Sequence, residues 1–319
     1  MSEKIPLSKT IKSRDFDGVF TEVKHSESLG LCNPNQVCIY HLNIENNAFS
    51  FEGLHSFLQS NIGRYVFSRA QINQFKMDDD EESIGLKAIE LLRKIKSIDD
   101  KGAGGELGEI LLYIFLEQIL GAPKLLSKVE LKTATNDYVK GSDGIHLWSG
   151  SDSGGQSIYQ LVLGESKIKG DLTGAITEAF KSIRNVIANP TNEVRLVESN
   201  IFKEAYTAEQ AEYIKSLIIP EKRGNKQLDK AFGIFIGYSV NLNPSGLSNS
   251  EYRAAVTKKL EQDIKDCTPN IIKRINEKST NGIDLSGYSF YFYVLPFNKA
   301  DDDRRSIIER LIGGGAARD

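Results

Sequence analysis

The sequence predicts an α/β fold in which a mixed β-sheet is flanked by helices. Three segments are apolar enough to form buried strands, at residues 157–168, 231–239 and 288–295. A nearly continuous apolar run is typical of a strand that is covered on both faces. Segments with helical spacing of their apolar residues alternate with these strands, and from residue 105 the predicted order is α-β-β-β-α-β, followed by additional elements.

Each element of this core has its own local signals. A helix is predicted from Glu106 to about Leu120, because a glycine-rich stretch precedes it and Gly121-Ala-Pro123 ends it. A second helix is predicted from about residue 172 to residue 187, before Asn189-Pro190. The other predicted elements are strands at 127–133 and 143–149, a long polar helix at 248–277 and a terminal helix at 301–311.

The first hundred residues are less regular. Residues 1 to about 75 are predicted to form short strands and turns, with a strand at 36–43 and a strand that runs into a short helix at 49–58. The acidic run at 78–82 precedes a predicted helix at 84–98, as expected for a solvated first turn. We therefore expect an N-terminal α+β region at 1–99 and a main domain at 100–319.

Composition excludes several classes of protein. The chain has 319 residues and a formal charge of −3, which argues against indiscriminate coating of nucleic acid but leaves room for a local basic groove. It has three cysteines without a CxxC pair and four histidines, which argues against a disulfide framework and a zinc site. Neither an apolar signal segment nor an apolar run of 18 residues is visible, so a cytoplasmic protein without a membrane span is expected.

Three residues near the middle of the chain carry the strongest chemical signal. Asp143 begins one predicted strand, and Glu165 and Lys167 end the most apolar one. Alternation along a strand places Glu165 and Lys167 on the same face, and Asp143 can lie beside Glu165 if the two strands pair. Two carboxylates can hold Mg²⁺ (or Mn²⁺), and a lysine beside them can orient or deprotonate an attacking water. Gly164 would let a phosphate backbone approach closely.

The predicted helix at 106–120 offers a further carboxylate. Glu106 and Glu109 are three residues apart and can face the same side. Glu109 is favoured because it follows Gly108 and lies deeper in the helix. A carboxylate there could reach a metal directly or through water, although the choice between the two glutamates stays open.

Other candidate residues have simpler interpretations. His146 is expected to point to the opposite face from Asp143, unless the strand begins irregularly at Gly144. The aromatic strand at 288–293 is more typical of a core than of a base-stacking platform. The basic segment Lys222–Lys226 could contact phosphate, but solvated loops of this kind are common.

The segments GGELGEILLYIFLE, GSDGIHLW and LVLGESK resemble the HamA family, the nuclease subunits of the Hachiman anti-phage system. The similarity covers roughly residues 100–300. It implies a restriction-endonuclease-like PD-(D/E)xK core that works beside a helicase partner, HamB. It also implies that Asp143, Glu165 and Glu109 are metal carboxylates and that Lys167 is the catalytic lysine. The proline of the motif's name is replaced here by Ser142.

These observations favour a metal-dependent DNA nuclease that serves as the effector subunit of a bacterial defence complex. On this interpretation 100–319 is the nuclease-like domain and 1–99 could bind the partner. Two alternatives remain open. One is a catalytically silent adaptor that docks on the helicase, and the other is a repair or restriction-type nuclease that acts alone.

Overall fold

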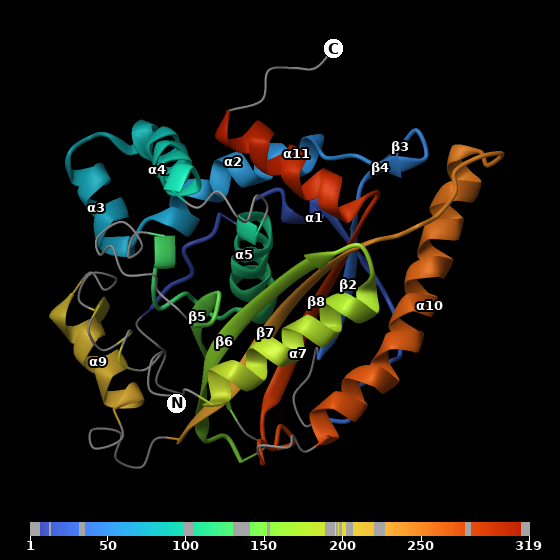
Figure 1. Cartoon of the computed structure of the whole chain (residues 1–319). Coiled ribbons are helices and arrows are strands. Elements are labelled where there is room, and N and C mark those ends of the chain that lie inside the picture. Colours follow the sequence, from blue (N-terminus) through green and yellow to red (C-terminus); the bar gives the residue numbers. More distant parts are fainter. Residues whose placement is uncertain are drawn as a thin grey trace.

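A six-stranded mixed sheet runs through the computed structural model of the chain (Figure 1). Its strands follow the order β1-β2-β8-β7-β6-β5, with the inner four parallel and both edge strands antiparallel. The expected mixed sheet flanked by helices is confirmed. The strands are β1 (Phe20–Val23), β2 (Val37–Leu42), β5 (Gly144–Ser151), β6 (Ser157–Lys169), β7 (Gln227–Ser239) and β8 (Ser289–Phe297), with a separate pair β3 (Ile44–Glu45) and β4 (Ala48–Phe49). The structure describes residues 7–12, 14–31, 36–98, 105–129, 141–151, 154–188, 195, 197, 200–201, 207–219, 227–277 and 282–313.

Helices cover the two faces of the sheet. On one face, Phe115 at the end of α5 stacks on Tyr293 of β8, with ring centroids 5.4 Å apart. On the other, Phe180 of α7 packs on Phe292, at 6.0 Å. Because consecutive strand residues point to opposite faces, these contacts place α5 and α7 on opposite sides. The helices are α1 (Phe16–Val19), α2 (Glu52–Val66), α3 (Arg69–Met77), η1 (Glu81–Ser83), α4 (Ile84–Ile98), α5 (Gly105–Phe115), η2 (Leu116–Leu120), α7 (Leu172–Ala188), α9 (Ala208–Ile218), α10 (Asn249–Asn276) and α11 (Ala300–Ile312).

The helices predicted for the second half of the chain are present with nearly the expected bounds. The long polar helix α10 begins at a capping box, in which Ser248 and Glu251 bond each other's backbone N–H groups. Apolar residues that recur every three or four positions bury one side of it, from Tyr252 to Ile275. Among the described residues, no helix is long and apolar enough to cross a membrane.

Strand β6 lies between the two helical layers, and this explains its composition. Residues Tyr159 to Ser166 are all buried. A strand that is covered on both faces cannot alternate between apolar and polar side chains without burying polar groups. The chain therefore brings Glu165 and Lys167 to the end of a strand that is otherwise core.

The N-terminal range contributes to the same sheet. Strand β2 pairs in parallel with β8, so the sheet crosses the boundary that we expected near residue 100. The short helix expected within 49–58 is present as the start of α2, but the expectation of short strands and turns is wrong for 59–66 and 69–77, which are also helical. In α2 the apolar side chains recur at helical spacing beyond Leu58, at Ile62 and Val66, and all three are fully buried.

The strand expected at 127–133 is not seen in the described part of that range. Lys128 and Val129 are helical, and residues 130–133 lie outside the described residues. An isolated antiparallel bridge joins Lys124 to His146, so the chain touches the outer edge of β5 without forming a strand there. An apolar-polar alternation as short as Val129 and Leu131 does not distinguish a strand from a turn.

A buried carboxylate fastens the N-terminal segment to the core. Glu117 lies in the π-helical turn that extends α5, and its side chain is fully buried. Its oxygens accept the backbone N–H groups of Thr10 (2.6 Å), Ile11 (2.7 Å) and Lys124 (2.9 Å). Arg69 is also buried and places its guanidinium 3.9 Å from the same carboxylate. These partners offset the cost of removing the charge from water.

Candidate active site

The pairing of β5 with β6 places Asp143 beside Glu165. Gly144 is opposite Gly164 in the antiparallel register, so the next residues outward are Asp143 and Glu165. The Asp143 backbone N–H donates to the Gly164 carbonyl at 2.7 Å, which carries the ladder one step beyond the strand. The expected pairing of these two strands is therefore confirmed.

Glycine is needed at position 164 for a different structural reason from the one that we expected. A Cβ atom at this position would lie 2.7 Å from Leu112 Cδ2 and 3.1 Å from the Gly144 backbone nitrogen. Real Cβ atoms do not approach other atoms so closely. The glycine admits helix α5 and the neighbouring strand, rather than leaving space for a phosphate.

The Asp143 carboxylate is held by the backbone and side chain of Ser166. Its Oδ2 atom accepts the Ser166 N–H and the Ser166 hydroxyl, each at 2.8 Å. Strand β5 begins only at Gly144, so its regular ladder ends before it reaches the Ser166 N–H of β6. The Asp143 carboxylate accepts this N–H instead. The half-buried Asp143 side chain thus sits at the edge of the sheet, between its two faces.

Glu165 and Lys167 point to the α7 face and contact each other. The Lys167 ammonium donates to Glu165 Oε1, and also to the Ser166 carbonyl at 3.2 Å. Ser182 of α7 donates to Glu165 from its side chain. Glu165 is 6% exposed, so its charge depends on these few partners.

The electrostatics of the pair are shaped by burial. Burial and the charge of Asp143 raise the pKa of Glu165 to about 7, against the opposing effects of Lys167 and Ser182. Burial lowers the pKa of Lys167, but the charge and hydrogen bond of Glu165 outweigh it and leave that pKa above its ordinary value. Lys167 therefore carries its proton at neutral pH, and its ammonium is a hydrogen-bond donor rather than a base.

Glu109 lies on the α5 side of the sheet edge, opposite the α7 face to which Glu165 and Lys167 point. Helix α5 can approach β6 because Gly108 has no side chain: a Cβ there would lie 2.9 Å from the Ser166 hydroxyl. The next residue, Glu109, accepts a hydrogen bond from the Tyr65 hydroxyl at 3.1 Å. Glu109 and Glu106 are both half-buried.

The three expected metal carboxylates do not form one cluster. Glu165 faces α7, Glu109 belongs to the α5 side, and Asp143 lies between them at the edge. Within the described ranges, no group of three or more His, Cys, Asp or Glu side chains is arranged to hold a metal ion. The arrangement instead presents a close pair, Asp143 and Glu165, with Lys167 bonded to one of them.

Four residues at this site were not singled out from the sequence. They are Tyr65, Lys128, Ser166 and Ser182. Lys128 is buried and its ammonium donates to the carbonyl of Ser142, just before Asp143. Lysines are rarely buried, so no pattern in the sequence would have indicated this position. Strand alternation puts Ser166 on the face opposite Glu165, but its bond to Asp143 depends on the register of two strands.

The remaining candidates have structural roles or lie elsewhere. His146 is buried, its Nδ1 is 2.8 Å from the Ala122 carbonyl, and burial lowers its pKa to about 4. Tyr291 and Tyr293 are buried in the core, as expected for the aromatic strand. The segment Lys222–Lys226 lies outside the described residues.

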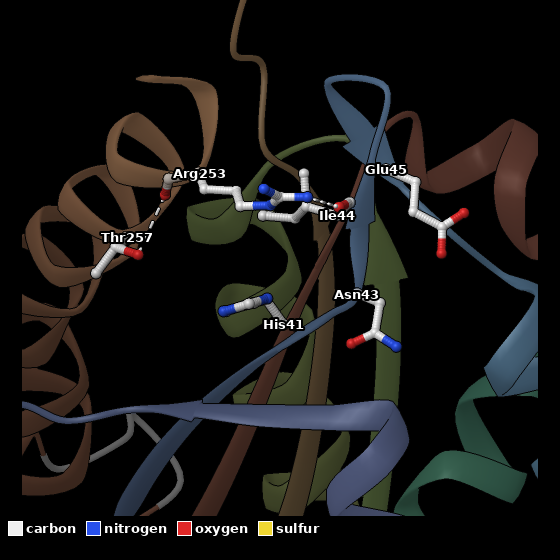
Figure 2. Close-up of a pocket in the computed structure, with 6 residues that line it drawn as sticks. All are labelled: His41, Asn43, Ile44, Glu45, Arg253 and Thr257. Atoms are coloured by element: carbon white, nitrogen blue, oxygen red, sulfur yellow. Dashed lines mark hydrogen bonds between the residues drawn. The ribbon is translucent and has the colours of Figure 1, made fainter. Parts of the chain in front are cut away.

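A pocket of about 480 Å³ lies away from these residues, between α10 and the β2–β3 segment (Figure 2). Figure 2 shows the Arg253 guanidinium reaching across from α10 to the Ile44 carbonyl, a hydrogen bond of 3.0 Å. The residues that line it are His41, Asn43, Ile44, Glu45, Arg253 and Thr257. It includes none of the candidate site residues, and its arginine joins α10 to β3.

The fold and site together define a mixed α/β protein with an acidic pair and a lysine at the end of an antiparallel strand pair. The chain belongs to the HamA family, whose model matches residues 18–311. Membership in this family implies a Hachiman anti-phage defence protein. No curated protein and no solved structure gives a significant match.

Proposed function

We propose that this chain is a metal-dependent nuclease of the PD-(D/E)xK type, which cleaves DNA as the effector of the defence system. The observation that carries the proposal is the juxtaposition of Asp143 and Glu165, with Lys167 bonded to Glu165. Phosphodiester hydrolysis requires an attacking water and stabilisation of the charge on the phosphate. Two carboxylates and a lysine supply residues for both requirements.

The acidic pair has the chemistry of a site for a hard cation. Mg²⁺ and Mn²⁺ prefer oxygen ligands, and Asp143 and Glu165 would hold the ion. Burial, and then repulsion from Asp143, raise the pKa of Glu165, and a bound cation would offset both effects. The Lys167 ammonium already bonds oxygens of Glu165 and Ser166, so this group of oxygens favours positive charge. When bound, Mg²⁺ would polarise the phosphate and lower the pKa of a bound water.

Lys167 acts as a donor in this proposal. Its raised pKa keeps it protonated, so it orients the attacking water and stabilises negative charge on the phosphate. Glu109 is proposed as a helical carboxylate that would reach the ion from the α5 side of the sheet edge, directly or through water. Its bond to Tyr65 supports a fixed orientation there.

DNA loading is assigned to the helicase partner that the family resemblance implies. A chain with a formal charge of −3 has little general attraction for phosphate, which is consistent with delivery of DNA by another subunit. The partner would also restrain the nuclease until DNA is engaged. Restraint predicts that the complex leaves intact plasmid uncut until the helicase engages DNA.

The test is plasmid cleavage by purified protein, with and without Mg²⁺ and with and without the helicase subunit. Asp143→Ala and Glu165→Ala should each abolish cleavage and weaken Mn²⁺ binding, while both proteins remain folded. Glu212→Ala is the matched control, because it removes an exposed carboxylate from α9. Equal Mn²⁺ affinity in the wild-type and both variant proteins would overturn the proposal.

The two alternatives have their own outcomes in this experiment. A wild-type chain that binds the helicase but binds neither Mg²⁺ nor Mn²⁺ is an adaptor. A chain that cleaves DNA efficiently by itself at physiological salt is a stand-alone nuclease, and the helicase is then not needed for loading.

A further inference from the structure

Tyr65 connects helix α2 to the candidate site. Its hydroxyl donates to Glu109 Oε2 at 3.1 Å, and the residue is only 9% exposed. A buried tyrosine hydroxyl needs a hydrogen-bond partner, and a bond to a carboxylate is stronger than one to a neutral acceptor. The contact joins residues that are 44 positions apart in the sequence.

The surroundings of Tyr65 are acidic. Burial, and then Glu109, Asp143 and Glu106, raise the pKa of the phenol well above its ordinary value. Its hydroxyl therefore keeps its proton and remains a donor. Helix α5 packs at Gly108 against Ser166, which bonds Asp143, so Glu109, the acceptor of the Tyr65 hydroxyl, lies on the helix that reaches this end of β6.

The backbone around Tyr65 is fixed by a buried ammonium. Lys124 is 2% exposed, and its Nζ donates to the carbonyls of Arg64 (2.6 Å), Tyr65 (3.2 Å) and Phe67 (2.7 Å). These carbonyls end α2, where a positive charge is favourable. The Lys124 carbonyl in turn accepts a bond of 2.8 Å from Arg69.

The ring of Tyr65 is also packed. It lies against the ring of Tyr113 of α5, with centroids 5.6 Å apart. The phenol thus has a fixed backbone, a packed ring and a hydroxyl aimed at one carboxylate. A side chain held in this way can define the orientation of its partner.

We propose that Tyr65 is a positioning residue of the candidate site, which holds the Glu109 carboxylate toward the sheet edge where Asp143 lies. This inference rests on the proposed function. It selects Glu109 over Glu106 as the helical acid, and it makes α2, from the N-terminal region, a structural part of the site.

The experiment measures Mn²⁺ affinity of the purified full chain by calorimetric titration, together with the melting temperature. Tyr65→Phe keeps the ring and removes the hydroxyl. Tyr159→Phe is the matched control, because Tyr159 is also buried and its hydroxyl bonds Tyr213 at 3.0 Å, away from the acids. Tyr65→Phe should weaken Mn²⁺ binding about tenfold, at the lower end of the effect of outer-shell residues on metal affinity. Tyr159→Phe should leave it unchanged.

A double-mutant cycle with Glu109→Gln tests the route of the effect. If Tyr65 acts through Glu109, then Tyr65→Phe should weaken binding little further in the Glu109→Gln background. An equal loss in both backgrounds would overturn the inference, as would wild-type affinity in Tyr65→Phe. A wild-type chain that does not bind Mn²⁺ would instead overturn the proposed function.

If Tyr65→Phe has a folding defect, the same contact can be tested by substituting the two helical glutamates instead. Glu109→Gln keeps an acceptor oxygen for the phenol and removes the charge. It should weaken Mn²⁺ binding much more than Glu106→Gln does. Equal effects of these two substitutions would contradict the selection of Glu109.

Discussion

The Asp143 carboxylate and Ser166 are joined by two hydrogen bonds, one from the backbone N–H and one from the hydroxyl, each 2.8 Å long. The carboxylate thereby occupies a position that a backbone carbonyl would have in a longer strand. Its orientation is consequently set by an inner strand of the sheet that is buried along most of its length. A rigid strand holds a functional group more precisely than a loop does.

Ser166→Ala should remove one of these bonds and leave the other. We expect a loss of about 1 kcal/mol in the free energy of unfolding. Mn²⁺ affinity should fall less than in Asp143→Asn, which keeps the shape but removes the charge. Chemical denaturation and calorimetric titration measure both effects, with Ser157→Ala at the other end of β6 as the control. If Ser166→Ala binds Mn²⁺ as weakly as Asp143→Asn, the hydroxyl does more than orient Asp143.

The stability of the protein should depend on pH through Glu165. Its pKa is about 7 in the folded chain, against an ordinary value of 4.5. Below about pH 4.5 the carboxyl is protonated in both states, and its contribution to stability is fully present. As pH rises through 7, the unfolded chain releases this proton first, so the contribution is lost, on the order of 3 kcal/mol.

Denaturation of the wild-type and Glu165→Gln proteins between pH 4.5 and 8 measures this difference. The wild-type protein should lose stability relative to Glu165→Gln up to about pH 7 and then remain constant. Parallel curves across the range would show that Glu165 has an ordinary pKa. Mn²⁺ affinity should rise over the same window, because the ion competes with the proton.

Lys167→Ala should separate cleavage from metal binding. Cleavage should fall at least about 10²-fold, since a positioned group of this kind is lost, while most Mn²⁺ binding remains. The free energy of unfolding at pH 8 should fall by more than about 1 kcal/mol, because the buried Glu165 charge loses its cation. Lys169→Ala is the control, since its side chain is 40% exposed and pairs with the exposed Glu178 at 2.8 Å. Near-wild-type cleavage by Lys167→Ala would remove this lysine from the mechanism.

Gly108→Ala should loosen the packing of α5 on β6. The new methyl group would lie 2.9 Å from the Ser166 hydroxyl and 3.1 Å from its Cβ atom, and we expect a loss of about 1–3 kcal/mol. Gly85→Ala in α4 is the matched control, because open space surrounds that position and alanine favours the helix by about 0.5–1 kcal/mol. Melting temperatures of the two proteins should therefore move in opposite directions. A shift of the same sign in both would mean that α5 can move away from the strand at little cost.

Much of the core was predictable because its signals are local. The apolar run of β6 and the helical spacing of α7 each fix an element type, and strand alternation places Glu165 and Lys167 on one face. The register that brings Asp143 to Glu165 follows once the two strands pair as a hairpin. The PD-(D/E)xK chemistry of these residues stays a prediction.

The rest of the site depends on contacts between distant segments. Tyr65 lies in a region that was expected to be short strands and turns, so its position beside Glu109 could not be inferred. Lys124 and Lys128 are buried, although lysine usually indicates a solvated position. Glu109 lies on the α5 side of the sheet and Glu165 on the α7 side, which only the three-dimensional arrangement of the two helices shows, and the metal role of Glu109 stays a prediction.

The position of β8 between β2 and β7 has a consequence for synthesis. Val37 to Ile39 pair in parallel with Phe292 to Val294, and among the described strands β1 and β2 are joined to the rest of the sheet only through β8, which is made last. Closing a loop of this length is slow, because the chain loses entropy before the strands gain contacts. A growing chain on the ribosome therefore carries its acidic pair and lysine long before its sheet is complete. The sheet can be completed only after β8 has emerged from the ribosome.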